Sequence, residues 1–170
     1  MGQRLGNGLL FQAGWFACVL SPQQPALLLV PLLAVAVHLS WVSSWAAEGY
    51  LLLGVWVAGT LLDSLLLRLG LFDFGEPRPW VPLWLSLLWL LLATCLNHCL
   101  AWTARPWWRA SLLGAISAPL SYYGGAQLAG VDLPYGTWPS LGVLAIIWAL
   151  LLPLLQAWAR RQARPAVEAS

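Results

Sequence analysis

An acidic residue inside a long apolar segment is the first candidate for chemistry in this sequence of 170 residues. Asp63 lies deep in the apolar stretch that begins at Tyr50, and its nearest polar neighbours are Thr60 and Ser64. Moving an aspartate into hydrocarbon costs about 3 kcal/mol, so a chain keeps one where it has a partner or a function. Two interpretations stay open for Asp63: a structural acid held by hydrogen bonds, and a functional acid that carries a proton or contacts a ligand.

A second set of polar residues is spread over other apolar segments. Its members are Gln12, His38, Asn97 and His98. Such groups commonly link membrane helices by hydrogen bonds worth about 0.6 kcal/mol each. They also suit a head-group site or a proton relay, and with Cys95 and Cys99 they raise the alternative of a metal or haem site. The spacing of no known ligand motif is present, so we expect no metal and no other cofactor.

The composition predicts the environment in which these residues act. Hydrophobic residues make up 61% of the chain, charged residues only 8%, and the mean hydropathy is +0.76. A soluble domain carries about 25% charged residues because its surface faces water, so this surface is expected to face lipid. The net charge of +2 comes from dispersed arginines and does not favour a nucleic-acid partner. Membrane lipids and other membrane or lipid-metabolism proteins are the expected partners.

The elements that must position these residues are predicted to be helices. Each apolar segment is long enough for a helix, and none alternates with period two. Six segments are predicted to span the membrane: residues 5–20, 26–40, 50–71, 81–104, 110–129 and 140–159. The fold class is therefore an all-α integral membrane bundle of six transmembrane helices. We expect one domain, residues 1–159, and a short basic cytoplasmic tail, residues 160–170.

The distribution of arginine predicts the orientation, because cytoplasmic loops are enriched in cations. An even number of spans puts both ends of the chain on one side. That side would carry Arg4, Arg105, Arg109, Arg160, Arg161 and Arg164. The opposite side would carry only Arg68 and Arg78. Both termini are therefore predicted to be cytoplasmic.

Counting depth at about 1.5 Å of rise per residue predicts which polar groups share a level. Asp63 falls in the outer half of its span, at nearly the height of Ser121, Tyr122 and Tyr123 on the fifth span. The second set falls in the cytoplasmic half. Adjacent helical residues point about 100° apart, so we expect at most one of Asn97 and His98 to face a given neighbour.

Several stretches of the chain are similar to a known family. They read FQAGWFACV at 11–19, GTLLD at 59–63, NH at 97–98 and GAISAPLSYYGG at 114–125. In these stretches the chain resembles a bacterial family of small multi-span membrane proteins, the domain of unknown function numbered twenty-eight seventy-eight. The resemblance implies a multi-pass protein of the bacterial cell inner membrane. Members of that family tend to accompany genes for fatty-acid modification, which favours a role with lipid.

Three functions fit these residues. The first is an accessory or binding protein for lipid or fatty-acid metabolism that holds an apolar ligand in the bundle, with Asp63 and Tyr122 at its polar end. The second is a small proton-coupled transporter that uses Asp63, and the third is an intramembrane lipid-modifying enzyme. We place the enzyme last and predict no catalytic residue, because the sequence contains no nucleophile motif and no pair of carboxylates at one depth.

Overall fold

The structure is a computed structural model that describes residues 2–168, with side chains for residues 2–163. Its helices are α1 Gly2–Leu20, α2 Leu29–Val37, α3 Trp45–Arg68, α4 Leu83–Leu96, α5 Trp108–Ala129 and α6 Thr137–Glu168. The described residues form no β-strand, and only an isolated bridge pairs Asp73 with Asp132. The predicted all-α fold with six helices is confirmed.

Three of the helical segments are long and apolar enough to cross a membrane. They are Pro25–Val42, Trp45–Arg68 and Thr137–Ala163. The first of these combines a 3₁₀ turn (η1, Pro25–Leu28), α2 and a π turn (η2, His38–Val42). α4 is apolar but shorter, and α1 and α5 contain more polar residues. These lengths and compositions support a membrane protein.

The prediction of one helix over residues 81–104 is wrong. α4 ends at Leu96, and the chain continues through turns at residues 97–100 into a second 3₁₀ helix, η3 Ala101–Ala104. The cause is polar: the side chain of Asn7 on α1 accepts a hydrogen bond from the backbone N–H of Cys99 at 3.3 Å. The last helix is longer than predicted: α6 continues past Ala159 to Glu168, through residues that were expected to form a tail.

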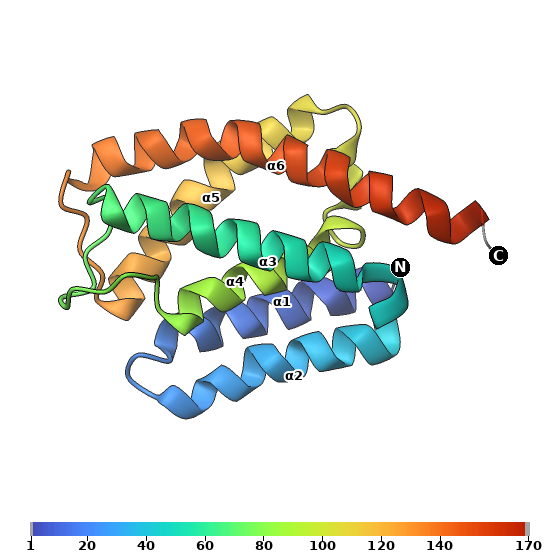
Figure 1. Cartoon of the computed structure of the whole chain (residues 1–170), viewed down its shortest axis with the longest axis horizontal. Helices are drawn as coiled ribbons and strands as arrows, with labels where there is room; N and C mark the ends of the chain where they lie inside the picture. Colours follow the sequence, from blue (N-terminus) through green and yellow to red (C-terminus); the bar gives the residue numbers. More distant parts are fainter. Residues whose placement is uncertain (1, 169–170) are drawn as a thin grey trace.

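α4 is the central helix of the bundle (Figure 1). It contacts α1, α2, α3 and α6, and most of its residues are buried. α5 packs mainly against α6, where Gly114 lies directly on the backbone carbonyl of Trp148 and Ser111 Oγ donates to the carbonyl of Ala149 at 2.6 Å. α1 begins and α6 ends at the same end of the bundle, on the right in Figure 1.

The opposite end carries the loop after α3, residues 69–82, and the loop after α5, residues 130–136. After α3, Gly70 takes the left-handed conformation (φ +79°), and the N–H groups of Gly70 and Leu71 bond back to the carbonyls of Leu67 and Leu66. This glycine-terminated cap ends the helix. Asp73 and Asp132 then exchange two backbone hydrogen bonds of 2.9 Å, which join the loop after α3 to the loop after α5. The helix ends nearest the cavity described below are thereby held together.

Because α5 and α6 approach closely at Gly114, adding one methyl group there should lower the stability of the fold. In Gly114→Ala the new methyl would meet the Trp148 carbonyl, and overpacking of this kind costs about 1–3 kcal/mol. We expect a lower midpoint of thermal unfolding in detergent, although alanine normally stabilises a helix by roughly 1 kcal/mol relative to glycine. Gly142→Ala on exposed α6, where nothing lies within 4 Å, should raise the midpoint. Equal shifts in the two variants would contradict this packing.

Candidate functional site

A cavity of 540 Å³ lies between α4 and α5 and extends along the bundle. α1, α6 and the loop after α3 complete its walls, and Asp63 contributes from α3. Eight aromatic residues line it: Phe11, Trp15, Phe72, Phe74, Trp84, Trp89, Tyr122 and Trp148. The other lining residues are mostly leucine and small residues, so the walls are apolar apart from Asp63 and a few amide and hydroxyl groups. Its volume is within the range of about 300–1,000 Å³ typical of ligand sites.

Asp63 is fully buried, and both of its carboxylate oxygens accept hydrogen bonds. The hydroxyl of Tyr122 on α5 donates to Oδ1 at 2.7 Å, and the indole N–H of Trp89 on α4 donates to Oδ2 at 2.7 Å. Gly59, one turn before Asp63, makes this possible because the indole ring of Trp89 lies against its backbone, where any side chain would clash. The acid therefore joins three helices.

Stacked aromatic rings hold both donors in place. Trp89 stacks on Trp148 of α6 with ring centroids 5.0 Å apart and planes 13° apart. Tyr122 stacks on Phe72 at 5.6 Å and 4°. Because the rings carry the donor atoms, this packing fixes the direction from which each hydrogen bond reaches Asp63.

The first predicted set of residues is only partly brought together. The expected contact between Asp63 and Tyr122 is present. Ser121 instead accepts a hydrogen bond of 2.8 Å from the indole N–H of Trp15, and Tyr123 is 39% exposed on the outer face of α5. Sequence reasoning missed Trp89 as a partner of Asp63, since depth counting does not show which way an indole turns.

The cavity opens between α1 and α5. Three of its lining residues are exposed: Gln12 on α1, and Ser117 and Leu120 on α5. Gln12 and Ser117 lie roughly 14–15 Å from the starts of their helices, at 1.5 Å per residue. The mouth is therefore on the side of the bundle, near mid-height, and not at either end.

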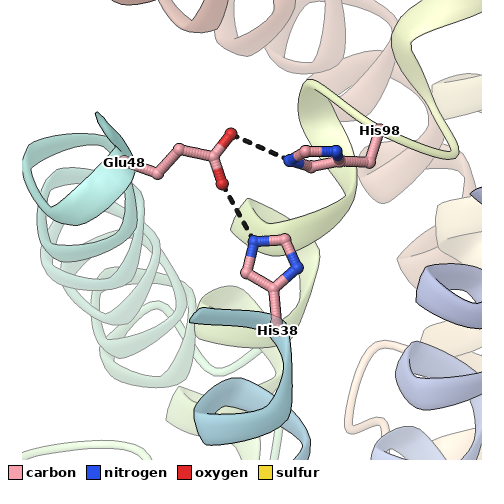
Figure 2. Close-up of side chains that lie close together, drawn as sticks. All are labelled: His38, Glu48 and His98. Carbon is pink, nitrogen blue, oxygen red and sulfur yellow. Dashed lines mark hydrogen bonds and ion pairs between the residues drawn. The ribbon is translucent and has the colours of Figure 1, made fainter. Parts of the chain in front are cut away.

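A second polar site surrounds Glu48, in the first turn of α3 (Figure 2). Its Oε2 lies 2.9 Å from His38 Nε2, and its Oε1 lies 3.0 Å from both His98 Nε2 and Asn97 Nδ2. His38 stands at the start of the π turn that ends α2, a type of turn often found at functional sites. Three N–H donors on two oxygens match the acceptor capacity of an ionised carboxylate.

The protonation of His38 follows from Asn7. The Asn7 oxygen must face the N–H of Cys99, and its NH₂ group donates to the carbonyl of Thr94 at 3.1 Å. These two backbone groups fix the orientation of the amide, so its NH₂ group also faces His38 Nδ1, at 3.2 Å. His38 Nδ1 must then accept, and the ring hydrogen is on Nε2, where it is donated to Glu48.

His38, Glu48 and His98 together offer three potential metal ligands, with the ligand atoms all within 4.8 Å of one another. A histidine that binds a metal through Nε2 normally donates its Nδ1–H to an acceptor. His38 Nδ1 instead faces a donor, the amide of Asn7. The surroundings of His38 therefore suit a hydrogen-bonded carboxylate better than a metal centre.

The second predicted set is also partly assembled. His38, Asn97 and His98 converge, whereas Gln12 lines the cavity instead. Our expectation that at most one of Asn97 and His98 faces a given neighbour is wrong, because α4 ends at Leu96 and the two residues leave helical geometry. Sequence reasoning missed Glu48 and Asn7. Glu48 follows His38 by only ten residues in the sequence, and this proximity could have indicated that the two residues pair.

Comparison with known proteins gives one match. The model of the family described as "Protein of unknown function (DUF2878)" matches residues 4–154. The chain belongs to this family. No curated protein and no solved structure matches it significantly. The family match confirms the resemblance found in the sequence. The three long apolar helical segments are compatible with a membrane protein.

Removing the tyrosine hydroxyl at the cavity should weaken the fold. Tyr122→Phe leaves Asp63 with one donor, Trp89, and we expect a loss of about 1–2 kcal/mol in unfolding free energy. The adjacent Tyr123→Phe removes the same atom from an exposed ring and should change stability by less than about 0.5 kcal/mol. Unfolding in detergent, followed by circular dichroism, measures both. Similar losses in the two variants would show that the Asp63 contact contributes nothing.

The Glu48 network predicts a larger effect. Glu48→Gln leaves one acceptor oxygen for three donors and places an NH₂ group among them, so we expect a loss of about 3 kcal/mol. Glu76→Gln makes the same change on an exposed loop residue, and its effect should stay within about 0.5 kcal/mol. The same unfolding assay compares the two, and a Glu48→Gln variant as stable as Glu76→Gln would contradict the network.

Proposed function

We propose that this protein is a multi-pass protein of the bacterial inner membrane that binds a lipid or similar apolar molecule in the cavity between α4 and α5. In this proposal all six helices cross the bilayer and both termini are cytoplasmic. One observation carries it: the apolar cavity of 540 Å³ has exposed lining residues only on α1 and α5 among the described residues, near mid-height. An opening at that level would face the acyl chains, so a ligand could enter directly from the bilayer.

The charges at the two ends of the bundle support the orientation. The end at which α1 begins carries Arg4, Arg105, Arg109, Arg160 and Arg161. Arg164 also belongs to α6, but its side chain lies outside the described residues. The opposite end carries Arg68 and Arg78 together with Asp73, Glu76 and Asp132. The excess of cations at the first end favours its placement in the cytoplasm.

The lower hydropathy of α1 and α5 is compatible with crossing. The polar groups of α1 include Asn7, buried in the Glu48 network, and Gln12 at the cavity. Those of α5 include Ser111, bonded to α6, and Ser117 and Ser121 at the cavity. Polar residues in a membrane bundle commonly face other helices or a cavity, as these do.

A proton-coupled carrier is the second candidate, and Asp63 favours it as the acid that lines the cavity. Replacement by asparagine tests this function: in proteoliposomes, pH-dependent flux should disappear in Asp63→Asn. Unchanged flux would exclude Asp63 as the proton carrier. An intramembrane enzyme has less support, because among the described cavity residues only Tyr122 accompanies Asp63 as a group able to exchange a proton.

Blocking the mouth tests lipid binding. Ser117→Trp places an indole in the opening between α1 and α5, and we expect most of the lipid retained by the purified protein to be lost in native mass spectrometry. Ile116→Trp adds the same ring at the neighbouring residue, which is 54% exposed and does not line the cavity, and should retain lipid. Equal retention by both variants, or no lipid in the wild-type protein, would argue against the proposal.

A further inference from the structure

We propose that the molecule held in the cavity is a long-chain lipid with an uncharged head group that carries a hydroxyl or carbonyl, and that this head group binds Gln12 and Ser117 at the mouth. The proposal rests on the proposed function, because it names the class of ligand for the same cavity.

The charges around the cavity exclude an anionic head group. Among the described lining residues none is a cation, and the one carboxylate is Asp63. A carboxylate or phosphate on the ligand would thus enter an apolar space without a counter-ion, which is strongly unfavourable. The arginines of α1 and α5, Arg4 and Arg109, stand eight residues before Gln12 and Ser117, about 12 Å away along the helix axes. Arg109 donates to the carbonyl of Arg105 and lies over Trp108, at the end of the bundle.

The hydrogen-bonding groups at the mouth are available. Gln3, Gln23 and Gln156 each donate to a backbone carbonyl, whereas Gln24, Gln127 and Gln162, which do not line the cavity, make no side-chain hydrogen bond among the described residues. The amide of Gln12 has no side-chain hydrogen bond to any other described residue, although it lies at mid-height. Ser117 donates its hydrogen to the carbonyl of Leu113, and its oxygen is left to accept. An amide without a partner in hydrocarbon is costly, so a ligand that supplies one would be favoured.

Gln12 on α1 and Ser117 on α5 both line the open side of the cavity. The helices run in the same direction, and the hydrogen bond from Trp15 to Ser121 sets their register. Gln12 is three residues before Trp15, and Ser117 is four residues before Ser121, so the two lie at about the same height. A ligand hydroxyl in the cavity could accept from the Gln12 amide or donate to the Ser117 oxygen. A carbonyl could accept from Gln12.

The inner walls suit the hydrocarbon part of such a ligand. Both oxygens of Asp63 already accept hydrogen bonds, and the adjoining surfaces are aromatic rings and leucines. The carboxylate inside the cavity therefore has its hydrogen bonds, whereas the Gln12 amide at the mouth makes no side-chain hydrogen bond to another described residue. This asymmetry places the head group at Gln12 and the chain inside.

Matched photoreactive lipids test the class of ligand. Hexadecanol and palmitate, each with the same diazirine in the chain, are added at alkaline pH to the full-length protein in nanodiscs, and labelled peptides are located by mass spectrometry. We expect hexadecanol to label peptides of the cavity with an apparent affinity at least about tenfold higher than palmitate, because only palmitate carries a charge. Palmitate labelling equal to or stronger than hexadecanol labelling would overturn the uncharged head group and leave the lipid-binding function standing. Labelling of the cavity by neither probe would overturn the proposed function itself.

Changes at Gln12 test its role at the mouth. Gln12→Leu keeps the approximate volume and removes the amide, so hexadecanol labelling should fall severalfold. Gln12→Arg supplies a cation and should raise palmitate labelling above that of the wild-type protein. Gln127→Arg adds the same charge on the exposed face of α5 outside the cavity, and should leave both probes unchanged. If Gln12→Leu labels like the wild-type protein, or if Gln127→Arg raises palmitate labelling as much as Gln12→Arg, the assignment of Gln12 is wrong.

Discussion

Burial of the Asp63 carboxylate is the constraint on which the cavity depends. An acid surrounded by hydrocarbon must receive hydrogen bonds, and here the donors come from α4 and α5. Each donor belongs to an aromatic ring, and these rings stack on Trp148 and Phe72. Large rings between α4 and α5 keep the two helices from packing closely, so the same residues that satisfy the acid form the walls of the cavity.

Glu48 meets the same constraint in a different way. Its donors are amide and imidazole groups from the ends of α2 and α4, and they approach through turns rather than through regular helix. Glu48 does not line the cavity between α4 and α5. Both carboxylates accept hydrogen bonds within the protein, but Asp63 also lines a cavity with exposed lining residues. This difference is why we propose binding near Asp63 and not near Glu48.

The sequence predicted what depends on distance along the chain. Helix rise is nearly constant, so counting residues was enough to place Asp63 level with Tyr122, and hydrophobic segments were enough to predict six helices. Rotation about the helix axis and the point at which a helix ends depend on tertiary contacts. For that reason the sequence did not predict that Ser121 accepts its hydrogen bond from Trp15. It also did not predict that α4 ends at Leu96, which lets Asn97 and His98 both bond to Glu48. Asn7, which ties down the chain at Cys99, gave no local signal of that role.

α1 and α5, the helices that border the mouth, are not among the three helical segments that hydropathy identifies as long and apolar enough to cross a membrane. The segments Pro25–Val42 and Thr137–Ala163 are apolar along almost their whole length, enough to cross a membrane. A helix that borders a cavity or bonds to its neighbours through side chains carries polar residues, and each such residue lowers the mean hydropathy of the helix. α1 and α5, which lie outside the set of clearly apolar spans, are the helices that carry Gln12 and Ser117. The lower hydropathy of α1 and α5 thus comes from polar side chains with different contacts: Asn7 bonds to His38, Ser111 bonds to α6, and Gln12 and Ser117 line the mouth of the cavity.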